Sequence, residues 1–255
     1  MLTKEEFHAK IAGGLHILDG ATASNLMKAG MPRGCCTEEW ILAHPDTLVA
    51  LQRSYAEAGA QIIYAPTFQA QPIALERVCL DKQTEAINAH LAALSRAAAP
   101  GCLIAGNLTT LATYTDSYDP DKFDLLVENY CRQIRGLMDG GADLLIGETL
   151  LYPQEAEAIL TAAELEGAGA AAVGFNCVAA DDILPGLVSK LRRQIKGPLL
   201  CKPNAGIPII GEDQLPHYPM GPAEFSRIMA DCAAMGADLL GGCCGTTPEH
   251  IRAIR

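Results

Sequence analysis

The pattern of apolar and polar positions alternates along the chain between two kinds of segment. Short, continuous apolar runs are followed by longer segments in which apolar residues recur with the period of an α-helix. The longer segments predict helices over residues 4–12, 37–42, 45–58, 84–99, 122–139, 154–165, 182–195 and 223–235. Continuous apolar strands that alternate with amphipathic helices indicate a parallel sheet covered by helices.

A repeat marks several of the predicted strands. The stretches 59–66, 141–148 and 236–243 each begin with glycine and alanine and continue into a short apolar run, and 169–176 is a looser copy. Three further apolar runs, at 15–18, 102–107 and 199–202, complete the predicted strands. The residues that follow or end these strands are Asp19, Pro66, Asn107, Glu148, Asn176, Asn204 and Cys243. Polar residues at so many strand ends favour a (β/α) barrel, in which they converge at one mouth.

Bulk composition narrows the class of protein. The 255 residues are 49% hydrophobic and contain no linker or low-complexity segment, so we expect a single domain over residues 1–255. A net charge of −11 argues against a nucleic-acid partner. No apolar run reaches the roughly 20 residues that span a bilayer, and no secretory signal is evident. Ten cysteines in such a chain favour a reducing, cytoplasmic location.

Two adjacent cysteines, Cys243 and Cys244, follow the last predicted strand in a glycine-rich loop. Their Cα atoms are about 3.8 Å apart across a trans peptide, which is too close for an ordinary disulfide. Neighbouring thiolates suit a soft metal, and zinc is the first candidate. Cys177, at another strand end, would complete a set of three thiolates with one open position on the metal. A thiol that binds there becomes a thiolate at neutral pH and hence a nucleophile.

The alternative is that these cysteines are buried free thiols, because cysteine is among the most buried residue types. This alternative has more weight for Cys177 alone than for the adjacent pair. We expect Cys79, Cys102, Cys131, Cys201 and Cys232 to be packing residues, and Cys35 and Cys36 to be partly exposed free thiols.

Two carboxylates also lie at strand ends. Glu148 leaves an otherwise apolar strand, where an unpartnered carboxylate would be costly, so a substrate ammonium is its natural partner. Asp19 permits the same interpretation, although Asp19-Gly20 is equally typical of a turn.

Five motifs resemble the homocysteine S-methyltransferase family, and among its members the homocysteine-binding module of cobalamin-dependent methionine synthase. They are Asp19-Gly20-Ala21-Thr22, Gly147-Glu148-Thr149, Gly174-Phe175-Asn176-Cys177, Lys202-Pro203-Asn204-Ala205-Gly206-Ile207-Pro208 and Gly241-Gly242-Cys243-Cys244-Gly245-Thr246-Thr247-Pro248. They occur in the order found in the family.

The resemblance implies a TIM-type (β/α)8 barrel that holds Zn²⁺ on Cys177, Cys243 and Cys244. It also implies that Asp19 and Glu148 act as catalytic residues by holding the amino group of homocysteine. The substrate-binding residues that it implies are Asp19, Thr22, Glu148, Asn176 and Asn204.

The chain departs from the family in two places. Family members commonly carry Glu-x-Asn-Thr-Phe after the second strand, where this chain has Tyr64-Ala65-Pro66-Thr67-Phe68. The family barrel has eight strands, whereas the pattern here predicts one fewer, with room for a single helix between Glu148 and Cys177. We therefore expect a (β/α)8 barrel in which one β/α unit is missing there, either because the barrel is incomplete or because the sequence lacks a segment, with a gap or irregular connection near Glu164–Gly169.

The expected function is zinc-dependent methyl transfer to homocysteine, giving methionine. The expected donor is methylcobalamin or another methyl-corrinoid, supplied as free cofactor or by a corrinoid protein. Two alternatives stay open: a homocysteine methyltransferase that uses a sulfonium or betaine donor, and a non-catalytic zinc- or thiol-binding module of a larger methyltransferase assembly.

Overall fold

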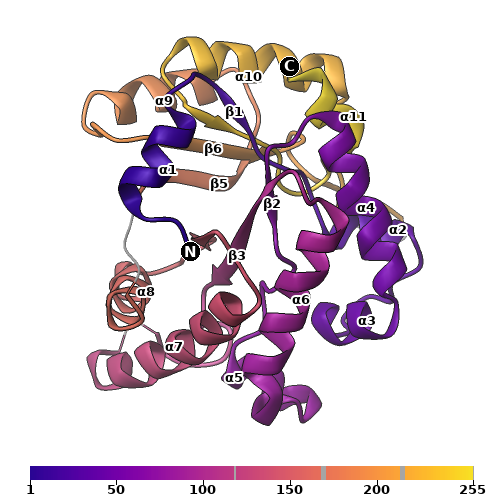
Figure 1. The fold of residues 1–255 in the computed structure, drawn as a ribbon. Coiled ribbons are helices and arrows are strands. Elements are labelled where there is room, and N and C mark those ends of the chain that lie inside the picture. The colour runs from indigo at the N-terminus through magenta and orange to yellow at the C-terminus, as the bar shows by residue number, and fades with distance from the viewer. Residues whose placement is uncertain (118, 168–170, 213–215, 255) are drawn as a thin grey trace. The chain divides into compact units, whose positions relative to one another are not determined.

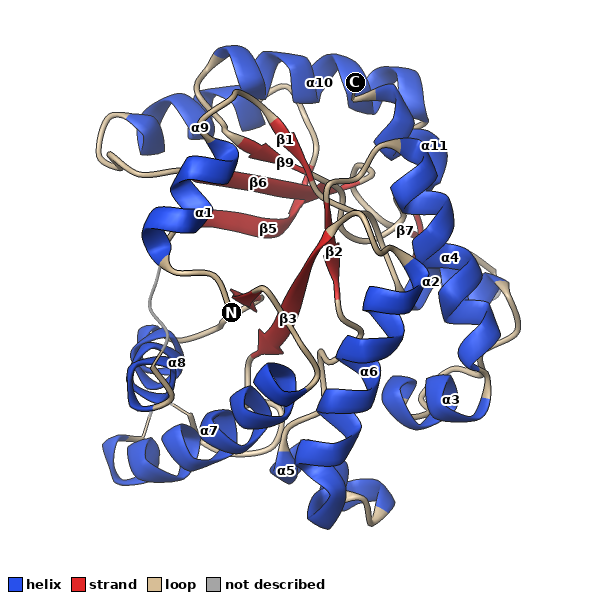
Figure 2. Cartoon of the chain, in the orientation of Figure 1, coloured by secondary structure: helices blue, strands red, loops and turns tan. Residues whose placement is uncertain are grey.

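Short strands alternate with helices along the chain, as the apolar pattern predicts (Figures 1 and 2). A computed structural model describes residues 1–117, 119–167, 171–212 and 216–254. One sheet has the strand order β1-β9-β6-β5 and a second the order β2-β3-β4. The pairs β1–β9, β9–β6, β6–β5 and β3–β4 are parallel. The expected α/β architecture with parallel sheets is therefore confirmed.

The chain divides into two compact units. The first contains residues 1–4, 31–49 and 64–170, and the second contains residues 5–30, 50–63 and 171–255. Strand β2 (Ile62–Tyr64) passes from the second unit to the first. The single domain expected from the sequence stays a prediction.

The first unit is built around β3 (Leu103–Thr109) and β4 (Leu144–Glu148), which pair from Ala105↔Leu144 to Thr109↔Glu148. Its helices are α3 (Thr37–Ala43), α5 (Pro72–Leu75), α6 (Thr84–Ala98), α7 (Phe123–Asp139) and α8 (Pro153–Leu165), with 3-10 turns at Glu76–Val78, Asp81–Gln83 and Pro120–Lys122. The core between sheet and helices is apolar and fully buried, and it includes Leu91, Ile104, Leu108, Tyr130 and Ile134.

The second unit holds the four-stranded sheet of β1 (His16–Ile17), β9 (Leu239–Leu240), β6 (Leu199–Asn204) and β5 (Val173–Ala179). Its helices include α2 (Ala23–Lys28), α9 (Leu184–Arg192), α10 (Pro222–Ala234) and α11 (Pro248–Ala253). Helices α9 and α10 lie along one side of this sheet (Figure 1). Helices α1 (Lys4–Ile11) and α4 (Pro45–Ala58) begin in the first unit and continue in the second.

Most predicted helices lie within two residues of the observed ones, because proline and glycine mark their ends. Helix α4 begins at Pro45 and ends at Ala58 as predicted, with Gly59 next at φ 107°. No helix was predicted at residues 23–28 or 72–75, which form α2 and α5, and β3 continues two residues beyond Asn107. Among the described residues, none of the helices combines the length and apolar character needed to cross a bilayer.

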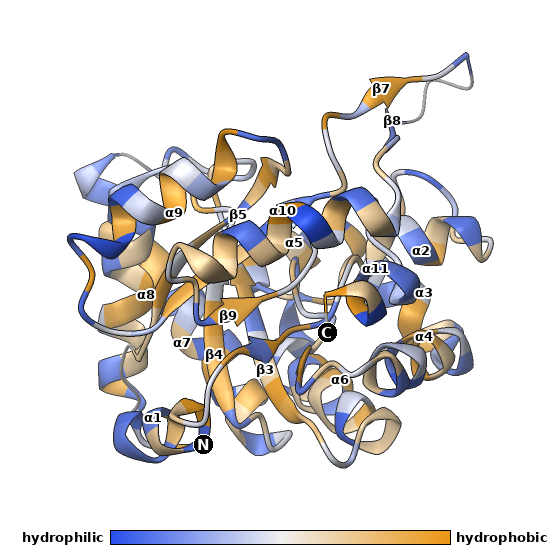
Figure 3. Ribbon diagram, turned by 90° about the horizontal axis from the view of Figure 1, so that it is seen from above, coloured by the Kyte–Doolittle hydropathy of each residue, from blue (hydrophilic) through white to orange (hydrophobic). Residues whose placement is uncertain are grey.

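A short antiparallel hairpin, β7 (Ile209–Ile210) with β8 (Pro216–His217), was not predicted. Ile209 is 59% exposed and Ile210 is 62% exposed, so neither packs in a core. Figure 3 shows the hairpin projecting from the rest of the second unit, with apolar β7 in orange. The alternation of apolar and polar residues that would mark an amphipathic strand is missing here.

Strands β4 and β5 are the outermost strands of their respective sheets. The described residues between them form one helix, α8, as the sequence predicts for a chain that lacks one β/α unit. The irregular connection predicted near Glu164–Gly169 lies partly in residues 168–170, which are outside the described residues. Val173, at the start of β5, is 58% exposed, and Leu165, at the end of α8, is 69% exposed.

One buried carboxylate ties α8 to the loops after β3 and β4. Glu155 accepts hydrogen bonds from the Thr110 hydroxyl at 2.7 Å and from the backbone N–H groups of Leu111 at 2.8 Å and Leu151 at 2.9 Å. Burial raises the pKa of Glu155, but hydrogen bonds from Thr110, Leu151 and Leu111 outweigh burial, so its pKa lies below the usual value.

Replacing Glu155 with glutamine should lower the free energy of unfolding by about 2–3 kcal/mol, because an amide has one acceptor oxygen for these donors instead of two. Since the folded-state pKa is lowered, this stabilisation is complete above the unfolded pKa of about 4.3 and is lost as pH falls through the folded value. Urea unfolding of wild type and Glu155→Gln between pH 3 and 7 measures both the loss of stability and its dependence on pH. Exposed Glu157 on the same helix provides the control Glu157→Gln, which should unfold like the wild type.

Candidate metal centre

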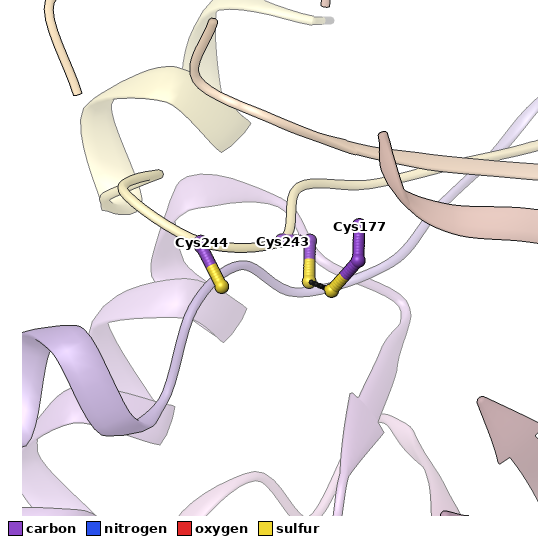
Figure 4. A group of neighbouring side chains, drawn as sticks. All are labelled: Cys177, Cys243 and Cys244. Carbon is purple, nitrogen blue, oxygen red and sulfur yellow. Dashed lines mark hydrogen bonds between the residues drawn. The ribbon is translucent and has the colours of Figure 1, made fainter. Parts of the chain in front are cut away.

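Three cysteine sulfurs lie together in the second unit (Figure 4). The Sγ atoms of Cys177, Cys243 and Cys244 are all within 4.8 Å of one another, and those of Cys177 and Cys243 are 2.9 Å apart. Sulfurs on a tetrahedral zinc ion, with Zn–S bonds of about 2.3 Å, lie about 3.8 Å apart. The three sulfurs therefore fit a shared zinc ion after small side-chain rotations, and thiolates are ligands that zinc prefers.

A local irregularity in β5 presents Cys177. The pairing of β5 with β6 shifts register between Asn176 and Ala179, and Cys177 has φ 55°. A non-glycine residue in this left-handed region carries strain, which the surrounding structure must offset. The Asn176 side-chain amide lies 3.6 Å from the Cys177 sulfur. The bulge thus turns the thiol out of the regular alternation of the strand.

Backbone hydrogen bonds hold the loop after β9. The Gly242 N–H donates to the Asp19 carbonyl at 3.0 Å, and the Cys243 N–H donates to the Pro203 carbonyl at 2.7 Å. The Thr246 hydroxyl donates to the Cys243 carbonyl at 2.7 Å, and it accepts from the Ala21 N–H at 3.1 Å. A Cβ on Gly242 would lie 2.4 Å from the Thr246 hydroxyl oxygen, so this turn requires glycine. These bonds join the first and last motifs of the sequence.

Asn204, the last residue of β6, bonds to both ligand segments. Its Nδ2 donates to the Cys177 carbonyl at 3.1 Å, and its Oδ1 accepts from the Cys244 N–H at 3.0 Å. The side chain is 9% exposed. It therefore fixes the spacing between the strand that carries Cys177 and the loop that carries Cys244.

A buried ion pair lies in the same unit. Nζ of Lys202 is 3.4 Å from Oδ1 of Asp19, and the two side chains are 5% and 1% exposed. Hydrogen bonds from Cys177 and Cys243 lower the pKa of the Cys244 thiol, and the positive charge of Lys202 also lowers it. The ammonium of Lys202 thus favours negative charge on the cysteine cluster. Sequence reasoning did not single out Lys202, although a lysine that continues an apolar strand was a signal that could have found it.

Tyr218 was also not anticipated. It follows β8 directly, and its ring lies against Gly245, where an added Cβ would be 2.2 Å from Cγ of Tyr218. Burial raises the pKa of Tyr218, and the negative charge on Cys244 raises it further.

The remaining predicted site residues have definite positions. Asp19 and Thr22 lie between β1 and α2, and the Thr22 carbonyl accepts the N–H of Leu26 in the first turn of that helix at 3.0 Å. Glu148 is the last residue of β4, in the first unit, and its carboxylate accepts a hydrogen bond from the Asn107 side chain at 2.8 Å. The second unit therefore gathers Asp19, Thr22, Asn176, Asn204 and the three cysteines, and the first unit holds Glu148.

Comparison with known proteins gives consistent matches. The sequence model of the family described as homocysteine S-methyltransferase matches residues 16–166 and 160–255. Methionine synthase from Mycobacterium tuberculosis (strain ATCC 25618 / H37Rv) is 26% identical over 288 residues, which cover 92% of this chain and 24% of that protein. The chain thus spans about a quarter of the length of this relative.

Solved structures show the same fold. The homocysteine methyltransferase MmuM from Escherichia coli, in its metallated form, superposes with a TM-score of 0.79 at 23% identity, covering 94% of this chain and 95% of that one. Its oxidised form gives 0.77 at 25% identity, with 94% of each chain covered. A methyltransferase from Methanosarcina mazei gives 0.63 at 14% identity, covering 100% and 97%.

The alignments also bear on the connection before β5. The two matched segments of the family meet at residues 160–166, at the end of α8. The alignment with the mycobacterial methionine synthase runs over 288 residues, more than the 255 of this chain. That relative therefore has residues within the aligned region that this chain lacks.

Replacing Asn204 with alanine should lower zinc affinity by about 10- to 100-fold, because it removes both hydrogen bonds that set the ligand spacing. Competition with a chromophoric chelator measures the affinity. Gln194→Ala, which shortens an exposed amide side chain of the same unit, is the control. Equal affinity in Asn204→Ala and the control would contradict the role given to Asn204.

Replacing Lys202 with methionine keeps the length of the side chain and removes its charge. We expect a loss of about 3 kcal/mol in the free energy of unfolding, because the buried Asp19 carboxylate loses that ammonium, together with weaker zinc binding. Urea unfolding and chelator competition measure the two effects. Lys190→Met, on the exposed side of α9, should change neither quantity. If Lys202→Met unfolds and binds zinc like the wild type, the ion pair contributes neither to stability nor to metal binding.

Proposed function

Because the chain belongs to the homocysteine S-methyltransferase family, we propose that it transfers a methyl group to the sulfur of homocysteine and forms methionine. The family confirms the enzyme class expected from the sequence, an S-methyltransferase. The observation that carries the proposal is the cluster of three cysteine sulfurs within 4.8 Å of one another. Such a cluster matches the ligand count of a zinc site that keeps one position for a substrate.

Cys177, Cys243 and Cys244 are the residues that would hold Zn²⁺. Bound zinc lowers the pKa of a thiol, so that the sulfur is a thiolate at neutral pH. Asn204 keeps the two ligand segments at fixed spacing through its bonds to Cys177 and Cys244. Lys202 places a buried positive charge in the unit that holds the thiolates, which offsets part of their negative charge.

We propose that the polar residues at the strand ends bind homocysteine. Glu148 and Asp19 offer carboxylates for the amino group, and each is held by a neighbour: Asn107 for Glu148 and Lys202 for Asp19. Thr22, Asn176 and Asn204 offer hydroxyl and amide groups for the remaining polar atoms of the substrate. Holding the sulfur and the amino group fixes the direction of attack on the methyl carbon, which accounts for much of the rate in such displacements.

The proposed methyl donor is methylcobalamin or another methyl-corrinoid, free or on a partner protein. The similarity to methionine synthase supports this choice. The match covers only 24% of the length of that relative. This partial coverage favours the alternative that the chain is a zinc- and thiol-binding module of a larger methyltransferase assembly. A sulfonium or betaine donor is the further alternative within the family.

A cytoplasmic location is proposed because all ten cysteines are free thiols.

Purified wild type should contain one zinc per chain and form methionine from homocysteine and methylcobalamin. Cys243→Ala should lose most of the zinc and at least 100-fold of the activity, because two thiolates bind zinc more weakly than three. Elemental analysis and methionine chromatography provide the readouts. The prediction that Cys79 is a packing residue was wrong, because this cysteine is exposed; Cys79→Ala, outside the cluster, is therefore the matched control.

Full zinc content in Cys243→Ala would contradict the ligand assignment. Homocysteine binding by zinc-loaded wild type without methionine formation from corrinoid, sulfonium or betaine donors would favour the binding module. Turnover with a sulfonium or betaine donor alone would replace the corrinoid in the proposal.

A further inference from the structure

The loop after β2 bonds to β3 through a side chain where backbone pairing ends. The last backbone bond runs from the Ala65 N–H to the Ala105 carbonyl at 2.8 Å. Pro66 has no N–H, and the Thr67 N–H turns back to the Ala65 carbonyl at 2.8 Å. The Thr67 hydroxyl takes over: it accepts the Asn107 N–H at 3.1 Å and donates to the Asn107 carbonyl at 2.9 Å. One hydroxyl thus bonds both backbone groups of Asn107.

Gln133, on α7, adds a second side chain to the same place. Its Nε2 donates to the Thr67 carbonyl at 2.7 Å and to the Asn107 carbonyl at 3.1 Å. Thr67 and Gln133 are 0% exposed and Asn107 is 6% exposed. Away from water a lost hydrogen bond is not replaced, so these bonds restrict Asn107 closely.

Asn107 transmits this restriction to the carboxylate at the end of β4. Its Nδ2 donates to Oε1 of Glu148 at 2.8 Å. A carboxylate only accepts hydrogen bonds, so the amide nitrogen has to face it, which fixes the orientation of the amide. Because the amide is neutral, this bond orients the carboxylate without neutralising its charge.

The backbone of Glu148 is held by a separate set of bonds. Thr109 is the partner of Glu148 in the pairing of β3 with β4. The Thr109 hydroxyl donates to the Glu148 carbonyl at 2.9 Å, and the Tyr130 hydroxyl donates to the Thr109 carbonyl at 2.8 Å. The bond from Asn107 therefore acts on the direction of the carboxylate and not on the course of the chain.

We infer that Thr67 and Gln133 are positioning residues, which act through Asn107 to direct the Glu148 carboxylate at the ammonium of the substrate. This inference rests on the proposed function, in which Glu148 binds the amino group of homocysteine. A charge-assisted hydrogen bond depends on distance and direction, so a carboxylate that rotates freely binds an ammonium less tightly. All four residues belong to the first unit. Residues 64–68, where the chain departs from the family, thereby gain a part in substrate recognition.

Calorimetric titration of the zinc-loaded protein tests this role with two ligands: homocysteine, and its des-amino analogue, in which hydrogen replaces the amino group. Thr67→Val keeps the branched shape of the side chain and removes the hydroxyl. It should weaken the binding of homocysteine about tenfold and that of the analogue less than about twofold, because only homocysteine carries the ammonium. Thr67→Ser, which keeps the hydroxyl, should recover most of the lost affinity.

A double-mutant cycle separates this relay of hydrogen bonds from a general loosening of the unit. In a Glu148→Ala background, Thr67→Val should weaken homocysteine binding by less than about twofold, because the group on which Thr67 acts has been removed. Gln133→Met removes the donor to both carbonyls and should show the same preference between ligands as Thr67→Val, so it carries the test if the valine variant does not fold. Thr161→Val is the matched control, because it removes a threonine hydroxyl of the first unit that bonds to a carbonyl of its own helix.

Wild-type affinity for homocysteine in folded Thr67→Val and Gln133→Met would overturn the inference. An equal loss of affinity for homocysteine and the analogue would also overturn it, since that pattern reports a loosened unit. So would a loss caused by Thr67→Val that is undiminished in the Glu148→Ala background. Wild type that binds neither ligand would remove the proposed function and this inference with it. Wild type that binds homocysteine but forms no methionine would count against the proposed catalysis, while the affinities would still decide the role of Thr67.

Discussion

The candidate metal centre depends on the position of β6 between two parallel neighbours. Because β6 pairs with β5 on one side and with β9 on the other, its C-terminal end lies between the strand that carries Cys177 and the loop that carries Cys243 and Cys244. Asn204 ends β6 and bonds to both. Backbone pairing thus brings together candidate ligands that are separated by more than sixty residues along the chain.

The polar groups around the cluster have complementary roles. The bulge in β5 aims the Cys177 thiol, and the Thr246 hydroxyl ties the cysteine loop to the segment after β1. Lys202, paired with Asp19, lowers the pKa of the Cys244 thiol. A rigid frame of hydrogen bonds with one favourable cation is what a cluster of thiolates requires, because thiolates repel one another at short range.

Much of the fold could be predicted because its signals are local. Proline at the start and glycine after the end locate α4 within the sequence, and Thr247-Pro248 marks the start of α11. The cysteine pair could be recognised because its glycine setting is unusual. By contrast, the left-handed backbone at Cys177 and the approach of Tyr218 to Gly245 depend on contacts between distant segments, which no local pattern encodes. Helix α2 was missed because its six residues have too short an apolar pattern to show a helical period.

All three candidate ligands belong to one of the two compact units. Any metal that binds the folded but not the unfolded cysteines shifts the folding equilibrium of that unit by mass action. The other unit gains from this linkage only to the extent that the two unfold cooperatively. The supply of metal would therefore affect the stability of the second unit more directly than that of the first. When metal is lost, partial unfolding would begin in the second unit, which carries the cysteines.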